Sequence, residues 1–201
     1  MDPAGPAADA INTIWWVMLA GATAIFLFVA ALLLLAFRPR ARRDASVRRW
    51  IVGGGLIFPG VVLTALLTFA LIVGERLLSR GDVPAGQVAA ESSPSQWSFT
   101  QPAAGAGTIR TQGVLHIPAG RPVDVTLTSR DVIHAFWVPR LAGKLDAIPG
   151  HRNVLRIEAD APGVYQGVCA EYCGVGHAGH MFRVVAHDAA GWARFQREGG
   201  A

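Results

Sequence analysis

One short stretch near the C-terminus gathers side chains that could bind a metal ion. The chain has two cysteines, Cys169 and Cys173, four positions apart, and His177 and Met181 follow at two further steps of four. Thiolate, imidazole and thioether groups are soft or borderline ligands, and copper suits this combination best. A structural zinc site closes with four cysteine or histidine ligands and does not use methionine. The stretch therefore predicts a copper site.

A copper site of this kind needs a second imidazole from elsewhere in the chain. His134 is the best candidate, because it follows the strand-like segment 123–128 and lies among large apolar residues. An isolated histidine in such a segment is more often a core residue, but a copper-type loop in the same domain favours a ligand. His116, His151 and His187 lack this support, so we expect them to make ordinary hydrogen bonds.

The same two cysteines allow other interpretations. They could form a disulfide in an oxidising compartment, or act as a redox dithiol. Redox motifs usually have two residues between the cysteines, whereas this pair has three. Neither interpretation explains His177 and Met181. A membrane-tethered copper carrier is a further alternative, and it would need an exposed, exchangeable site for a single ion.

Two long uncharged runs indicate that the chain is anchored in a membrane. Residues 11–37 form a run of 27 without a charge, and residues 50–74 form a second run of 25. About 20 apolar residues span a bilayer as a helix, so we expect a transmembrane helix over each run. A cleaved signal peptide fits the first run badly, because the run is too long and residues 1–10 contain no basic residue.

An arginine-rich segment, residues 38–49, separates the two runs. It holds six of the 18 basic residues of the chain, and the positive-inside rule places it in the cytoplasm. The external N-terminus, residues 1–10, and the C-terminal part then lie on the periplasmic side of a bacterial inner membrane. No nucleic-acid recognition motif accompanies the arginines, so we expect no nucleic-acid partner.

The remainder of the chain has the pattern of an all-β domain. Residues 75–95 are polar and rich in glycine, proline and serine, which predicts a linker. From residue 96 to 201, short apolar and β-branched segments alternate with turn residues, as in a small Greek-key domain. We expect strands at residues 113–117, 123–128, 132–138, 153–157, 164–168 and 182–186, and a short helix at 191–197.

These features together resemble cytochrome c oxidase subunit II. The likeness lies in residues 115–125, 131–139, 143–150 and 169–174, and in the order of the elements along nearly the whole chain. The resemblance implies a two-helix transmembrane hairpin followed by an all-β, cupredoxin-like Greek-key domain. It also implies the subunit through which electrons enter a haem–copper terminal oxidase.

The resemblance further implies a dinuclear copper A centre. Cys169 and Cys173 would bridge two copper ions, with His134 on one ion and His177 on the other. The backbone carbonyl of Glu171 would be the weak ligand on one ion.

Other family roles concern the surroundings of this centre. Met181 would supply the second weak ligand, and the Glu171 side chain would help to hold a magnesium ion shared with subunit I. Asp131 would contact the ligand His134 without binding copper itself. Trp97 resembles the family's exposed tryptophan that receives electrons from cytochrome c, and the alternative is an ordinary core aromatic of the first strand.

The implied partners are oxidase subunit I, subunit III, a soluble cytochrome c and the lipid bilayer. Electrons would pass from the copper pair to haem in subunit I, where oxygen is reduced to water and protons are translocated. The chain contains no Cys-x-x-Cys-His haem motif of its own. A copper A subunit of a nitric oxide reductase would share the same site and remains the alternative, whereas quinol-oxidising relatives lack the copper cysteines.

Three features depart from the family pattern. Relatives usually place methionine three residues after the loop histidine, where this chain has His180, and Met181 comes one residue later. We expect Met181 to be the ligand because a thioether suits the weak axial role, with His180 as the alternative. Residues 48–69 contain no acid that could replace the proton-path glutamate of many relatives. Fewer aromatic residues surround Trp97.

Overall fold

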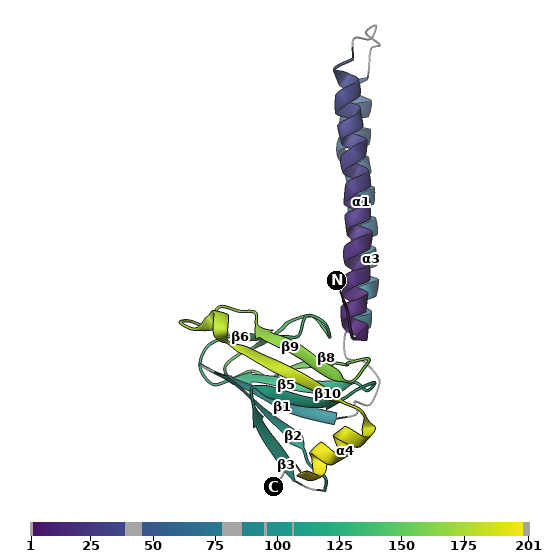
Figure 1. Ribbon diagram of the computed structural model, residues 1–201. Coiled ribbons are helices and arrows are strands. Elements are labelled where there is room, and N and C mark those ends of the chain that lie inside the picture. The colour runs from purple at the N-terminus through teal and green to yellow at the C-terminus, as the bar shows by residue number, and fades with distance from the viewer. Residues whose placement is uncertain (1, 39–45, 78–85, 95, 106, 199–201) are drawn as a thin grey trace. The chain divides into compact units, whose positions relative to one another are not determined.

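The structure is a computed structural model. It describes residues 2–38, 46–77, 86–94, 96–105 and 107–198. The chain divides into two compact units, of which one is Ile14–Arg80 and the other combines Met1–Thr13 with Gly81–Ala201. Figure 1 shows the first unit as long helices and the second as a body of strands.

The helical unit is apolar over nearly its whole length. Helix α1 spans Pro6–Ala36, and a second helical segment comprises α2 (Val47–Arg49), the π-helical η1 (Trp50–Ile57) and α3 (Phe58–Leu77). Both segments are long and apolar enough to cross a membrane, with a mean hydropathy of 2.6. Helices that are hydrophobic on every side and exposed suit a lipid environment.

The second helical segment begins earlier than its uncharged run. Val47 already starts α2, so Arg48 and Arg49 are helical and do not belong to a loop, which corrects the predicted segment 38–49. Arginine is a good helix former, and the end of an uncharged run therefore does not mark the end of a helix. Residues 39–45 of that predicted loop lie outside the described residues.

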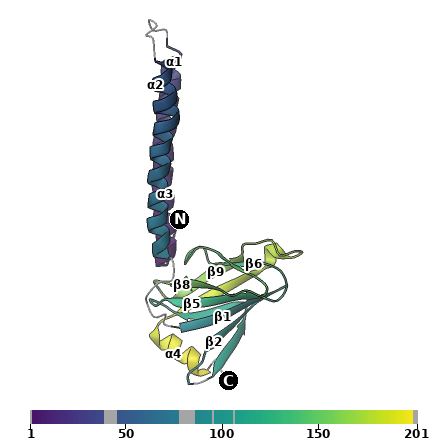
Figure 2. The same cartoon turned by 180° about the vertical axis from the view of Figure 1, so that it is seen from behind.

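The β domain is a sandwich of two five-stranded sheets, arranged β3-β2-β1-β5-β8 and β4-β10-β9-β6-β7. The first sheet can be followed in Figure 2. Its strands are β1 (Gly86–Ser93), β2 (Gln96–Pro102), β3 (Thr108–Gln112), β5 (Val123–Ser129) and β8 (Asn153–Ile157). The second sheet contains β4 (Val114–Pro118), β6 (His134–Trp137), β7 (Leu145–Ala147), β9 (Gly163–Cys169) and β10 (Met181–His187).

Most strand pairs are antiparallel, but β1 runs parallel to β5 and β10 runs parallel to β4. Aromatic side chains from both sheets fill the space between them, and Trp97, Phe99, Phe136 and Phe182 are all buried. The rings of Phe136 and Phe182 stack with centroids 4.5 Å apart. This core forms the floor beneath the cysteine loop.

Each of the six predicted strand segments overlaps an observed strand, and helix α4 (Ala189–Glu198) covers the predicted segment 191–197. The predicted linker 75–95 is wrong at its C-terminal end, because β1 lies inside it. The inward positions of β1 are Val88, Ala90 and Ser92. Small and polar inward residues give no alternation of large apolar groups, so the strand has no sequence signal.

The first residues of the chain are built into the β domain. Ala4 donates its backbone N–H to the Arg140 carbonyl at 2.7 Å and accepts from the Asp160 N–H at 2.9 Å. Gly5 lies so close to Glu158 that a Cβ there would be 2.1 Å from the Glu158 carbonyl oxygen. The predicted external N-terminus is therefore a structural part of this unit.

Candidate metal centre

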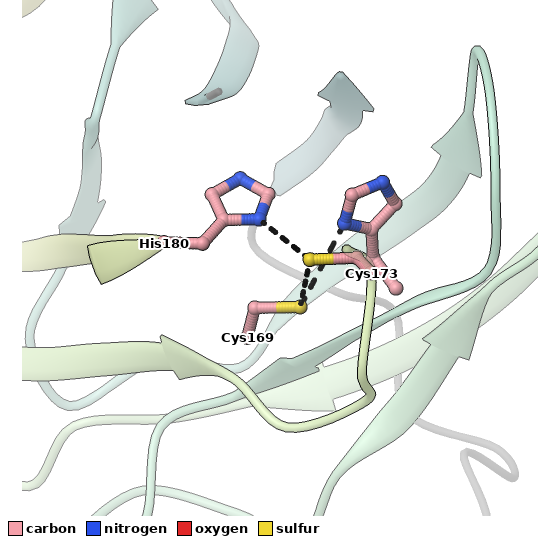
Figure 3. A group of neighbouring side chains, drawn as sticks. Cys169, Cys173 and His180 are labelled. Atoms are coloured by element: carbon pink, nitrogen blue, oxygen red, sulfur yellow. Dashed lines mark hydrogen bonds between the residues drawn. The ribbon is translucent and has the colours of Figure 1, made fainter. Parts of the chain in front are cut away.

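The two cysteines face each other at one end of the sandwich. Cys169 is the last residue of β9 and is buried, while Cys173 lies in the loop that follows and is half-buried. Their Sγ atoms are 3.9 Å apart and not bonded, because a disulfide requires about 2.05 Å. Figure 3 shows both sulfurs directed at the same point. The pair is open for a metal ion to touch both sulfurs.

The sheet register brings His134 to this pair. Phe136 of β6 pairs with Cys169 of β9, and His134, two residues earlier, is fully buried with its Nδ1 3.7 Å from the Cys169 Sγ. Its Nε2 lies 3.0 Å from the Asp131 carboxylate. When Nε2–H donates to that carboxylate, Nδ1 keeps a lone pair facing the sulfur, which is how metal-binding histidines are oriented.

Asp131 is poised to hold this tautomer. Desolvation raises the pKa of its carboxyl, but the hydrogen bonds from His134 and from the Val132 backbone outweigh that effect and leave the pKa below its usual value. An ionised Asp131 at neutral pH favours a proton on Nε2 of His134. The supporting role predicted for Asp131 is consistent with this contact.

The loop after Cys173 carries His177 back over the second sulfur. Gly174 and Gly176 have φ values of 113° and 91°, which glycine adopts without strain, and they curve the loop tightly. His177 then opens a 3-10 turn, His177–Gly179, with its Nδ1 3.4 Å from the Cys173 Sγ.

Glu171 contributes its backbone to the site. Its carbonyl oxygen lies 3.3 Å from the Cys169 Sγ, where the thiol can donate to it. Its half-exposed carboxylate points elsewhere and lies 3.6 Å from the Lys144 Nζ. The two functional groups of Glu171 are therefore separated, one toward the sulfurs and one toward the surface.

His180, and not Met181, occupies the remaining position beside the sulfurs. The His180 Nδ1 is 3.6 Å from the Cys173 Sγ, and the side chain is buried. The donor atoms of His134, Cys169, Cys173 and His180 all lie within 4.8 Å of one another. Met181 is 52% exposed, which argues against the expectation that it is the ligand.

The exposure of Met181 and the burial of His180 have a simple physical cause. Met181 is the first residue of β10, in which Phe182, Val184 and Ala186 are buried and the residues between them are more exposed. Side chains alternate between the two faces of a strand, so Met181 points away from the core and His180 points into it.

Trp97 is a core residue, which corrects the expectation of an exposed tryptophan that receives electrons. Its exposed fraction is 0%. The indole stacks on His180 with centroids 5.9 Å apart and meets the His134 ring edge-on at 6.2 Å. Its Nε1 has no hydrogen-bond partner within the described residues. Trp97 therefore forms the inner wall of the site.

The environment keeps the Cys173 thiol protonated. Burial, followed by the nearby Cys169 sulfur, raises its pKa to about 11. Burial also lowers the pKa of His180, with the His134 imidazole adding to the effect. Neutral imidazoles have lone pairs for a cation, and a bound cation in turn deprotonates thiols. The donor set therefore fits a soft cation.

The comparisons with known proteins point to one family. The family model "Cytochrome C oxidase subunit II, periplasmic domain" matches residues 99–187. Cytochrome c oxidase subunit 2 of Alkalihalophilus pseudofirmus is 31% identical over 92% of this chain and 57% of that protein. The resemblance to cytochrome c oxidase subunit II is thereby confirmed. An alternative cytochrome c oxidase subunit 2 of Bradyrhizobium diazoefficiens is 28% identical over 88% of this chain and 74% of its own.

Solved structures support the same subunit II fold. The periplasmic domain of subunit II of cytochrome oxidase from Bradyrhizobium japonicum matches with a TM-score of 0.53 and 25% identity, over 60% of this chain and 99% of that one. A chain of a heme-copper terminal oxidase dimer matches with a TM-score of 0.50 and 26% identity, over 67% and 98%. The β domain is thus the predicted cupredoxin-like sandwich.

The match does not extend over the full length of all relatives. The chain spans 57% of the first curated relative and 26% and 30% of the next two. What the comparisons show in this chain is the subunit II domain.

Proposed function

We propose that this chain is the subunit through which electrons enter a haem–copper terminal oxidase, and that it binds two copper ions. The observation that carries the proposal is the placement of Cys169 and Cys173, whose sulfurs face each other with further donors on each side of the pair. When bound, the copper pair would accept one electron and release it again.

The donors around the sulfurs are enough for two ions. His134 stands against Cys169 and His177 against Cys173, at 3.7 Å and 3.4 Å. The Glu171 carbonyl adds a weak oxygen donor at 3.3 Å from Cys169. Cys169 and Cys173 would hold both ions, with His134 for one and His177 for the other. Because the protein fixes these donors in place, the site would change little between oxidation states.

The surroundings favour electron transfer over copper delivery. A carrier needs an exposed site that exchanges its ion, whereas Cys169 and His134 are buried and Trp97 seals the inner side. A dithiol redox module would not need the imidazoles that approach both sulfurs. The copper A subunit of a nitric oxide reductase remains the alternative, since it would use the same donors.

We further propose the partners and location that the family implies. The two apolar helices would anchor the chain in the bacterial inner membrane beside subunit I, with subunit III in the same complex. The β domain would lie in the periplasm, where a soluble cytochrome c delivers electrons. The Glu171 carboxylate, now paired with Lys144 on the surface, would exchange this partner for a magnesium ion shared with subunit I.

Copper stoichiometry tests the proposal. The full chain, purified in detergent and reduced before loading, should bind two copper ions per chain, and Cys169→Ser should lose both. His151→Gln is the control, because His151 is exposed and its backbone N–H bonds to the Ile148 carbonyl. A stoichiometry of one ion per wild-type chain would contradict the proposal.

The assembled complex separates the two enzymatic alternatives. Co-purified with its partner subunits and supplied with reduced cytochrome c, it should consume oxygen. Consumption of nitric oxide with no consumption of oxygen would favour the reductase.

A further inference from the structure

We infer that His180 is a further ligand of the copper centre, on the ion that His134 would also bind, so that three imidazoles would surround the pair. This inference rests on the proposed function, because it assigns a ligand within the same dinuclear site. The family pattern has a methionine thioether at this position, and this chain would use the His180 imidazole instead.

The backbone fixes His180 beside the sulfurs. Its N–H donates to the His177 carbonyl at 3.0 Å, and its own carbonyl accepts from the Cys169 N–H at 2.9 Å. The next residue, Met181, pairs with Val168 across the β9–β10 ladder. Hydrogen bonds therefore hold His180 both to the loop that carries His177 and to strand β9, which ends at Cys169.

The strand register prevents Met181 from taking its place. A shift of β10 by one residue would turn Phe182 and Val184, both buried, out to solvent. The loss of two large apolar groups from the core would strongly destabilise the domain. One weak metal–thioether contact does not offset such a cost.

The geometry assigns His180 to the same ion as His134. Their donor nitrogens and both sulfurs form a group within 4.8 Å, and His177 does not belong to that group. The two imidazole rings meet edge to face with centroids 5.0 Å apart. His177 and the Glu171 carbonyl remain for the second ion.

Figure 3 shows the His180 ring with its nitrogen directed at the Cys173 sulfur. Trp97 covers one face of this ring, at 26° to its plane. The other nitrogen, Nε2, has no hydrogen-bond partner in the described part of the chain. A packed ring with one nitrogen aimed at the sulfurs is oriented as a ligand, and Trp97 is the residue that positions it.

An imidazole ligand changes the electronic properties of the centre in a predictable direction. Imidazole donates more strongly than a thioether and favours the oxidised state of copper, and axial ligands tune copper potentials. The midpoint potential should therefore be lower with His180 than with methionine at the same position. The unpaired electron should also be shared less evenly between the two ions.

Pulsed electron paramagnetic resonance tests the ligand directly. The full chain, labelled with ¹⁵N-histidine and loaded with copper in detergent, should show three coupled imidazole nitrogens. His180→Met should show two, with a higher midpoint potential, while Met181→Leu should retain three and an unchanged potential.

Two nitrogens in the wild type, or a midpoint potential that changes in Met181→Leu, would overturn the inference while leaving the dinuclear centre intact. The wild-type count decides the question even if His180→Met does not fold. A wild-type chain with one copper ion would instead refute the proposed function itself, so the two failures are distinguishable.

Discussion

The β domain contains two clusters of histidines, and they differ in what their nitrogens face. At one end, the Nδ1 atoms of His134, His177 and His180 are directed at two sulfurs. At the other, His116 and His187 are bonded to each other, with Nδ1 and Nε2 2.8 Å apart. The first cluster leaves lone pairs for a cation, whereas the second pairs one nitrogen of each ring with the other.

The surroundings of the second cluster explain its role. Phe195 of α4 stacks on His116 with centroids 4.2 Å apart, and His187 and Trp192 extend the stack. No sulfur or carboxylate approaches these rings within hydrogen-bonding distance in the described residues. The number of histidines therefore does not identify a metal site. What identifies it is several donor atoms with unused lone pairs that face the same point.

The largest effect should come from removing one sulfur. Cys173→Ser replaces a bridging thiolate by a hydroxyl, which is a poor ligand for copper, so both ions should be lost. His187→Gln should keep the wild-type copper content, measured by elemental analysis of the full chain. Loss of copper in His187→Gln would break the distinction between the clusters.

A smaller effect is expected from the residue behind His134. Asp131→Asn removes the charge that orients the imidazole, and such partners typically contribute about 10- to 100-fold to metal affinity. Competition with a copper chelator should measure this loss. Asp160→Asn is the matched control, since Asp160 is exposed and its backbone N–H bonds to the Ala4 carbonyl. Equal affinities in the two variants would argue against orientation by Asp131.

The aromatic cluster should respond to loss of its packing and not to copper. Phe195→Ala removes a half-buried ring from the stack on His116, and should lower the free energy of unfolding by about 1–2 kcal/mol. Chemical unfolding of the full chain in detergent measures the change. The copper content should stay the same, and a decrease would show that the two ends are coupled.

The last effect is a pH dependence of stability. Burial, followed by the charge of His187, lowers the pKa of His116 to about 4. The unfolded chain, with a pKa near 6.5, binds this proton first as the pH falls, so stability should decrease between pH 6.5 and pH 4.

The groups around the pair set the size of this effect. Burial also lowers the pKa of His187, where Asp188 opposes the shift and Arg194 adds to it. The thermal midpoint of the full chain should therefore fall less between pH 7 and pH 5 in His116→Gln than in the wild type. The same fall in both would assign the acid sensitivity to other groups.

Residue chemistry alone predicted most of the site. Cys169, Cys173 and His177 are close in sequence, and soft donors in one loop allow few other interpretations. His134 lies 35 positions from Cys169, and only the fold brings it there. Its choice among the histidines rests on its position after segment 123–128 and among large apolar residues.

For Met181 and for Trp97, the alternation of apolar residues predicts which side chains are buried, and the expectation from ligand chemistry or family resemblance ran against it. Phe182, Val184 and Ala186 alternate as a strand, and extending that alternation backward places His180 inside and Met181 outside. In the same way, Trp97 and Phe99 alternate with polar residues, which predicts a buried Trp97. Strand β1 could not be predicted, because its inward positions are small or polar and only pairing with β2 and β5 defines it.

The most direct test of the central claim is the continuous-wave electron paramagnetic resonance spectrum of the copper-loaded full chain. One unpaired electron shared by two copper nuclei gives more hyperfine lines than one localised on a single nucleus, with seven lines for equal sharing and four for a single ion. We expect a pattern from two nuclei, with the electron shared somewhat unequally because of His180. A four-line spectrum from a single copper ion would contradict it.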